Sequence, residues 1–472
     1  MLKGKTTIEL TDVNTGEKKV YEHHNTITKS LEKLLKDHGS LMDPRYLFTS
    51  NGVSSLYPYR TNALGGLLLF DNEIDPKNGE TIFAPTSASM VGCGVYNKTS
   101  TNNVRGSYNS SESYYNSQEK SMKYVYDFAT NQANGTIKSV CLTSAAGGYG
   151  GYENENNVCT LSDDSNNFAY GRFACTPTLT IGERVLFAID LTNDKCYYHN
   201  ITGITNIDVY TYNAGLYNKR IFHDPLNAGK ELSKTSYNID INSTNYTAGF
   251  FDQKHNTLHV IGHTSYNWAN GVTLKVSKID LTNGTVENYT LTNDSGNTIM
   301  LFHNSSSEPK SWSVYALIYD NIFYFYQNKS SEYVYKMDIA NSDNNKSLAV
   351  PLNYASMFVY GERIAFTNLD RTINISASNI VYVYNPETDI LTKSGLHSHV
   401  MTENTNGFEC AHIVPCIDTD GLIVYRIGRA SNNFYYKFYT LNPYLATINN
   451  LETPIVKTDA STMKVIYTIT EE

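Results

Sequence analysis

The feature that most constrains the fold is a loose repeat in the second half of the chain. Each copy is an apolar strand that runs into a polar turn. The copies lie at 185–193, 276–284, 334–341, 381–388 and 434–439. With Ile279, Met337, Tyr384 and Tyr439 as anchors, successive copies are 58, 47 and 55 residues apart. A gap of 90 residues follows the first copy, which leaves room for one degenerate unit.

Most copies are preceded by a second apolar strand that a tight turn opens. These strands lie at 256–261, 320–325, 361–366 and 420–425. A unit of roughly 45–55 residues that holds a small antiparallel meander is typical of a β-propeller blade. One blade cannot bury both of its faces, so blades stack and close into a ring. We therefore predict a β-propeller-like region at 151–460, with tandem β-sandwich domains as the alternative.

The composition agrees with a mainly β protein. The chain has 38 Tyr, 12% aromatic and only 18% charged residues, and roughly one residue in nine is Asn. Tyr and Thr favour pleated surfaces, whereas Asn and Gly fill turns. The net charge of −9 argues against nucleic-acid binding, which needs clustered positive charge.

Residues 1–150 are predicted to form a separate β-rich domain with one helix. A hairpin is expected at 7–23 with its turn at 14–16, followed by a helix at 28–36 that Thr28 or Ser30 caps. The end of the chain, 461–472, alternates like the opening strand. We expect this last strand to return to the N-terminal domain and pair with the first.

No targeting or membrane segment is expected. The residues after Met1 lack the apolar stretch of a signal peptide, and the apolar run at 65–70 is too short to cross a bilayer. The seven Cys are scattered and odd in number, which indicates free thiols in a reducing cytoplasm.

Three segments carry a resemblance to a known class of protein. They are 4–17, 63–70 and 462–470. Together they resemble structural tail proteins of phages, prophages and phage-tail-like bacteriocins of low-GC Gram-positive bacteria. The resemblance is clearest over the first 145 residues and the last dozen, and it extends to the repeats only in architecture.

The resemblance implies a virion protein that is made in the host cytoplasm without a signal peptide. The N-terminal region would dock on other tail or baseplate proteins, and the distal β-rich region would meet a glycan or protein receptor on the host surface. A homo-oligomer is implied, with a trimer favoured. Neither nucleic-acid binding nor membrane insertion is expected.

Aromatic and amide side chains are the candidates for receptor binding. Tyr266, Asn267 and Trp268 lie in a predicted loop between strands, and Trp312 opens the next unit. Rings stack on the CH faces of sugars while amides bond their hydroxyls, so these residues predict a glycan site. The alternative is that the aromatic rings form the core of the blades.

One metal site is a candidate. His397 and His399 share one face of a predicted strand, because side chains repeat every second residue. The pair resembles the His-x-His motif with which trimeric phage fibres coordinate a metal ion on their axis. The simpler alternative is that the two histidines lie in a loop after Gly395. Three further histidines, His255, His259 and His263, are spaced too widely along a strand to share one ion.

No catalytic or cofactor-binding motif is present, so we predict no cofactor and a binding protein rather than an enzyme. A single segment at 292–299 resembles the Asp-box of sialidase-type propellers, where it shapes a turn. The prediction is a tail fibre or baseplate receptor-binding protein. The alternatives are a purely structural baseplate or head-decoration component, a propeller-fold glycan hydrolase and, last, a cytosolic binding module.

Overall fold

The structure is a computed structural model of the whole chain that divides into two compact units. It describes residues 2–29, 31–32, 64–77, 89–116, 118–143, 160–161, 180–181, 184–190, 193, 195–213, 231–302, 316–326, 333–340, 345–350, 355–360, 363–368, 381–394, 408–417, 423–430, 433–442 and 445–471. The first unit comprises 1–169, 394–397 and 439–472, and the second comprises 170–393 and 398–438. The chain is nearly all β, as predicted.

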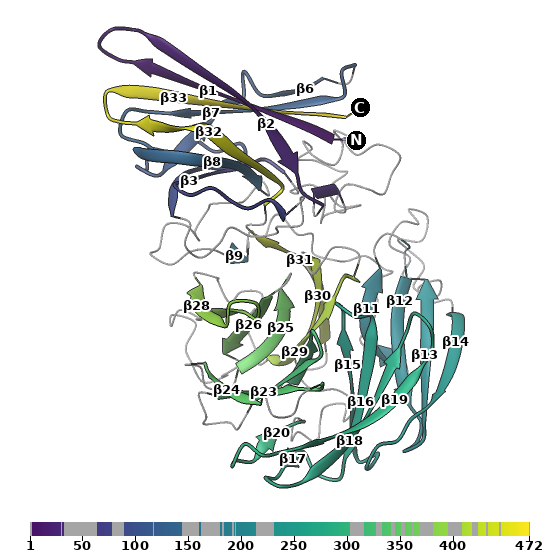
Figure 1. Ribbon diagram of the computed structural model, residues 1–472. Helices are drawn as coiled ribbons and strands as arrows, with labels where there is room; N and C mark the ends of the chain where they lie inside the picture. The colour runs from purple at the N-terminus through teal and green to yellow at the C-terminus, as the bar shows by residue number, and fades with distance from the viewer. Residues whose placement is uncertain are drawn as a thin grey trace. The chain divides into compact units, whose positions relative to one another are not determined.

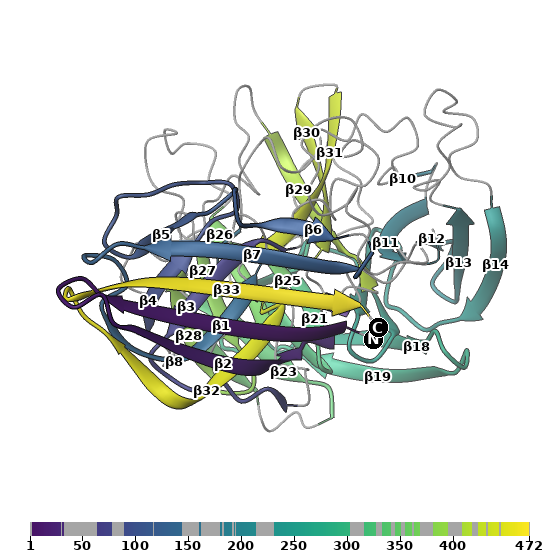
Figure 2. The same cartoon turned by 90° about the horizontal axis from the view of Figure 1, so that it is seen from above.

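The first unit contains a barrel, which we call the barrel domain (Figures 1 and 2). Its strands are β1 (Leu2–Asp12), β2 (Lys18–Ile27), β3 (Gly66–Phe70), β4 (Met90–Gly94), β5 (Arg105–Tyr108), β6 (Tyr114–Asn116), β7 (Ser121–Phe128), β8 (Gly135–Thr143), β32 (Thr447–Lys457) and β33 (Ser461–Glu471). Nine of them follow the order β33–β1–β2–β32–β8–β3–β4–β5–β7, and β7 pairs again with β33. This second pairing closes the barrel, and β6 extends the sheet beyond β7.

Both ends of the chain meet in this barrel. β1 pairs with β33 in antiparallel register from Leu2↔Glu471 to Asp12↔Ser461. Both strands alternate between buried and more exposed residues, because one face of each points into the core. The expected hairpin is present, since Asp12 accepts bonds from the backbone of Asn14 and Thr15 and thereby shapes the turn.

The predicted helix begins where Thr28 caps it. Of the predicted span 28–36, the structure describes helical residues only at 29, 31 and 32. The Thr28 hydroxyl oxygen lies 3.3 Å from the amide nitrogen of Leu31, which donates to it as expected of an N-cap. The same hydroxyl donates to the carbonyl of Leu445 over 2.7 Å, so it also ties the helix start to the segment before β32.

The chain leaves the barrel after β8 and re-enters it ahead of β32. These two strands are neighbours, with Asn449 opposite Val140. The amide of Ala446 donates to the carbonyl of Leu142 over 2.8 Å, so the points of exit and return lie side by side. The return begins earlier than residue 461, because β32 is already a barrel strand. The intervening sheets are therefore an insertion between two adjacent strands of the barrel.

Five antiparallel sheets follow one another in the insertion, which we call the propeller-like domain. The first sheet holds β10 (Thr180–Ile181), β11 (Arg184–Asp190), β12 (Lys195–Ile201), β13 (Asn206–Asn213) and β14 (Glu231–Asn238), and the second holds β15 (Tyr246–Asp252), β16 (Thr257–His263), β18 (Thr273–Asp280) and β19 (Val286–Thr292). The third sheet holds β21 (Ala316–Tyr319), β22 (Ile322–Tyr326), β23 (Tyr333–Asp338) and β24 (Lys346–Ala349), and the fourth holds β25 (Ala355–Tyr360), β26 (Arg363–Asn368), β27 (Val381–Asn385) and β28 (Ile390–Ser394). The fifth sheet holds β29 (Phe408–Pro415), β30 (Ile423–Ala430), β31 (Asn433–Asn442) and β9 (Thr160–Leu161). Two short strands, β17 (Asn267–Trp268) and β20 (Ile299–Met300), pair beside the second sheet.

The five sheets lie beside one another in a series, as the blades of a propeller do. The first long strands of the first four sheets contact each other in sequence: β11 contacts β15, β15 contacts β21, and β21 contacts β25. β11 also contacts β29 of the fifth sheet, and Ile189 of β11 bridges in parallel to Cys416, so the first sheet lies between the second and the fifth. Separate apolar cores fill the spaces between sheets one and two, two and three, and three and four. The predicted propeller-like architecture is confirmed.

The sequence repeat corresponds to side chains that play the same part in successive sheets. Val276 faces the core shared with the third sheet, and Val334, at the matching position, faces the core shared with the fourth. Ile279 and Met337 face the opposite way, toward the preceding sheet in each case. The repeat therefore records which face of each strand packs on which neighbour.

The lysines of the repeat bridge to the following sheet. The ammonium of Lys278 lies 3.5 Å from the side-chain oxygen of Asn321 in the first turn of the third sheet. The ammonium of Lys336 lies 2.7 Å from a carboxylate oxygen of Asp389 in a turn of the fourth sheet. Each lysine is only partly exposed, so its aliphatic part covers the core while its charge reaches the neighbouring turn.

A buried histidine makes the second sheet sensitive to acid. His259 is fully buried, with its ring nitrogens 2.9 Å from the hydroxyl of Thr257 and 2.8 Å from that of Tyr289. Burial, then the charges of Lys278 and His255, lowers the pKa of His259 to about 3. Between about pH 6.5 and pH 3 the unfolded chain binds this proton and the folded chain does not.

We expect this histidine to cost stability as the pH falls through that window, at up to about 1.4 kcal/mol per pH unit. The measurement is the free energy of unfolding in urea from pH 7 to pH 4 for the wild type and for His259→Gln. The slope should be shallower in the variant, whereas His24→Gln on the exposed face of β2 should keep the wild-type slope. Equal slopes for all three proteins would contradict the assignment.

Candidate ligand-binding corner of the second sheet

The structure brings together some of the predicted binding residues and leaves others outside its described part. Tyr266, Asn267 and Trp268 lie in the connection between β16 and β18. Trp312, His397 and His399 lie outside the described residues.

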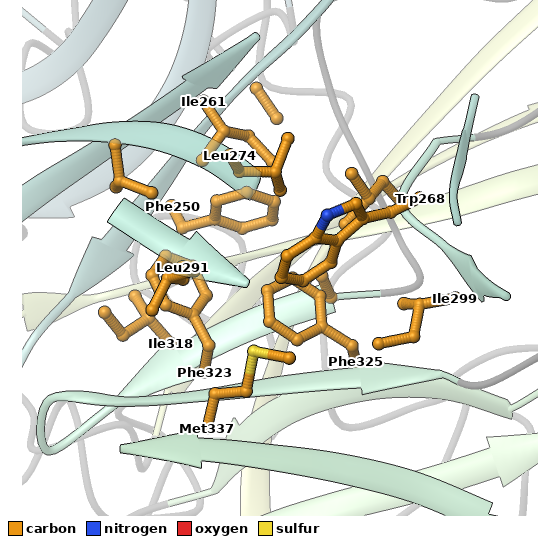
Figure 3. Packing of buried hydrophobic residues seen from close by; sticks show 14 of the residues in the cluster. Phe250, Ile261, Trp268, Leu274, Leu291, Ile299, Ile318, Phe323, Phe325 and Met337 are labelled. Atoms are coloured by element: carbon orange, nitrogen blue, oxygen red, sulfur yellow. The ribbon is translucent and has the colours of Figure 1, made fainter. Parts of the chain in front are cut away.

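Trp268 is a core residue, and its prediction as a ligand contact was wrong. Its side chain is fully buried between the second and third sheets, where it meets the edge of Phe325 at a ring-centre distance of 5.4 Å (Figure 3). Its indole N–H donates to the carbonyl of Val272 over 2.7 Å. Neither ring face is open to a sugar, so the alternative of core packing applies at this position.

Asn293 holds two loops together above the tryptophan. Its side-chain nitrogen donates to the carbonyls of Trp268 and Asn297, each over 2.8 Å. Its backbone N–H donates to the carbonyl of Val272. Because Asn293 is fully buried, these bonds are shielded from water and fix the relation of the two loops. We call the surface of the loops 264–272 and 292–298 the amide corner.

The outer side of the amide corner presents polar groups on a rigid base. Asn270 and Asn297 are exposed, while Tyr266 and Asn267 are half-buried. The side-chain oxygen of Asn270 accepts a bond from the amide of Gly296 over 2.8 Å, which fixes the side chain and leaves its NH₂ directed elsewhere. The corner therefore offers pre-positioned amide donors and acceptors, which lose little entropy on binding.

The corner carries no side-chain cation. Its loops contain no Lys, Arg or His, and Asp294 is their one acid. The hydroxyl of Tyr335, on β23, donates to that carboxylate. Burial, then this bond to Asp294, raises the pKa of Tyr335, so the hydroxyl stays protonated and continues to donate. Such a surface suits neutral hydroxyl-rich ligands and offers no cationic side chain to a phosphate or carboxylate.

Sequence reasoning missed the structural residues of the corner. The Asp-box-like segment pointed to a turn here, and the turn is present, with Gly296 at a φ of +75°. The segment did not reveal that Asn293 is the buried anchor, or that Asp294 is bonded from the next sheet. The position of Asn293 directly before the indicated turn was the sequence signal for its role as an anchor. No residue near the segment signals the bond from Tyr335 to Asp294.

Metal-ligating side chains do not gather in the described part of the chain. No group of three or more His, Cys, Asp or Glu side chains able to hold a metal occurs there. His263 lies on β16 beside Ser265, and His255 lies 2.9 Å from a carboxylate oxygen of Asp320 on the following sheet. Among the described residues, no helix is long and apolar enough to cross a membrane.

Comparison with solved structures gives remote likenesses. No family model matches the chain, and no curated protein matches it. An uncharacterized protein from Listeria monocytogenes aligns at 9% identity with a TM-score of 0.23, over 56% of this chain and 59% of that protein. An oligogalacturonate lyase from Vibrio parahaemolyticus aligns at 10% identity with a TM-score of 0.26, over 69% of this chain and 83% of the lyase. At these scores the likenesses carry no inference about activity or ligand.

Proposed function

We propose that the chain is a receptor-binding tail protein of a phage or a phage-tail-like particle. The barrel domain anchors it to neighbouring tail or baseplate proteins. The propeller-like domain adheres to the host surface, and its ligand is a glycan. The mechanism is binding, with several copies per particle multiplying weak contacts by avidity.

One observation carries the proposal. Three segments resemble phage tail proteins: 4–17 overlaps β1, 63–70 includes β3, and 462–470 lies within β33. All three strands belong to the barrel domain, although 390 residues lie between β3 and β33 in the chain. Sequence segments whose resemblance is confined to one domain are what a shared attachment module with a divergent insertion would produce.

The insertion supports the division of labour. It is inserted in the chain between β8 and β32, which are neighbouring strands of the barrel, where a single loop would otherwise suffice. Loops on a rigid scaffold are where binding residues concentrate. Within the insertion, the amide corner supplies neutral hydrogen-bonding groups of the kind that sugar hydroxyls accept.

Binding to intact cells tests the proposal. We expect fluorescently labelled protein to bind a subset of low-GC Gram-positive strains, and purified wall polysaccharide from a bound strain to compete. Asn270→Ala should weaken binding at least about threefold, since it removes amide hydrogen bonds that each contribute about 1 kcal/mol. Asn283→Ala is the matched control, because it also alters an exposed turn asparagine of the second sheet.

The outcomes separate the candidate functions. Failure to bind any strain and to block adsorption of the particle would leave a purely structural baseplate or decoration protein. Release of small saccharides from the polysaccharide would favour a glycan hydrolase. Equal binding by both variants would retain an adhesin and exclude the amide corner as its site.

A further inference from the structure

One strand of the barrel has a largely open edge. β2 pairs with β1 from Thr11↔Lys18 to Gly4↔Asn25. On its other side β2 pairs with β32 only at Thr26 and Ile27. Across the described ranges, no strand pairs with this side of β2 between residues 18 and 25. An unpaired edge of this length is a template for another strand.

The hydrogen-bond pattern shows which backbone groups face the open edge. The amide of Asp12 donates to the carbonyl of Glu17 over 2.9 Å, so these two residues form a hydrogen-bonded pair of the hairpin. Hydrogen-bonded and non-hydrogen-bonded pairs alternate along an antiparallel ladder. Lys18, Val20 and Glu22 therefore direct their N–H and C=O groups away from β1. Thr26 has the same parity, which agrees with its pairing to β32.

The side chains of the same residues lie on the exposed face. Lys18, Val20 and Glu22 are all exposed, and Val20 is 51% exposed despite being apolar. The ammonium of Lys18 lies 2.8 Å from the carboxylate of Glu9, and the carboxylate of Glu22 lies 2.9 Å from the ammonium of Lys5. The edge thus presents a basic, an apolar and an acidic side chain in order, at alternate positions.

That order is self-complementary, and we propose that β2 pairs with β2 of a second copy of this chain. We place the two strands antiparallel with the two-fold axis at Val20, so that Val20 faces the partner's Val20. Lys18 then faces the partner's Glu22, and Glu22 faces the partner's Lys18. Four charged side chains then form a row across the interface, in the order Glu9, Lys18, Glu22 of the partner subunit and the partner's Lys5. Negative and positive charges alternate along this row. A sheet continuous across two barrels results, with each open edge covered by the other.

Self-complementarity is the reason for naming a second copy. Directly opposed unlike charges stabilise a strand pair, whereas like charges destabilise it. A shift of the register by one residue would oppose Lys18 to the partner's Tyr21 or His23 and lose both cross-pairs. An isologous interface of this kind gives a closed dimer.

Sedimentation equilibrium of the full chain over a range of concentrations tests the pairing. The wild type should be in a monomer–dimer equilibrium. Val20→Pro removes the outward N–H, leaves the β1 ladder in place, and should raise the dissociation constant at least about tenfold, because two hydrogen bonds are lost per dimer. Val20→Lys places like charges across the axis and should act in the same direction. Val456→Lys, at an exposed valine of β32, should leave the equilibrium unchanged.

Charge reversal tests the register. Glu22→Lys opposes two pairs of lysines and should weaken the dimer, and adding Lys18→Glu should recover association. Circular dichroism shows whether each variant is folded. A wild type that stays monomeric at all concentrations would overturn the proposal. So would an assembly, dimeric or trimeric, that both Val20 variants leave intact.

Discussion

Replacing Trp268 with alanine is expected to destabilise the propeller-like domain by about 3–5 kcal/mol. The indole is fully buried between two sheets, so its removal leaves a cavity that the rigid sheets refill only in part. The indole N–H also donates to the carbonyl of Val272, which then keeps only the bond from the backbone N–H of Asn293. Urea unfolding followed by circular dichroism measures the change.

The control for this change is Asn270→Ala on the exposed side of the same corner. It should alter the free energy of unfolding by about 1 kcal/mol or less, because it removes a single exposed hydrogen bond. If Trp268→Ala left stability unchanged and only weakened ligand binding, the assignment of Trp268 to the core would be wrong.

Removing residues 461–472 is expected to prevent the barrel domain from folding. The deletion takes away β33, which pairs with both β1 and β7. It also removes four buried side chains, Met463, Val465, Tyr467 and Ile469. At about 1.5–3 kcal/mol for each, the lost burial is comparable to the whole stability of a typical domain.

Limited proteolysis reads out this deletion, because an unfolded barrel domain is cleaved within residues 1–143. Thr468→Ala is the matched control, since Thr468 lies on β33 but is half-exposed, whereas the residues on either side of it point into the core. It should leave the cleavage pattern unchanged. A truncated chain as resistant as the full one would show that the pairing of the two ends is dispensable.

The repeat made the propeller-like domain predictable. Val276 and Val334 stand at equivalent positions because each must pack on the following sheet. The same apolar pattern therefore recurs in the sequence once for each sheet. The hairpin and the Thr28 cap were predictable for the same kind of reason. For the hairpin and the cap the signal is local, because a turn or a helix cap is formed by side-chain hydrogen bonds between residues close in sequence.

The amide corner was predicted only in part, because its outcome depends on distant residues. Trp268 stands among Tyr and Asn in a connection between strands, which is equally typical of a sugar-binding loop. Its burial is set by Phe325 on the third sheet, and no pattern near Trp268 contains that information. The early return of the chain at β32 was missed likewise, because 447–457 pairs with β8, far away in sequence.

Electron cryo-microscopy of the particle that carries this chain tests the central claim most directly. We expect density for the barrel domain against the tail or baseplate, and the propeller-like domain directed outward with the amide corner uncovered. Density on the head, or a propeller-like domain enclosed by other tail proteins, would contradict a receptor-binding role.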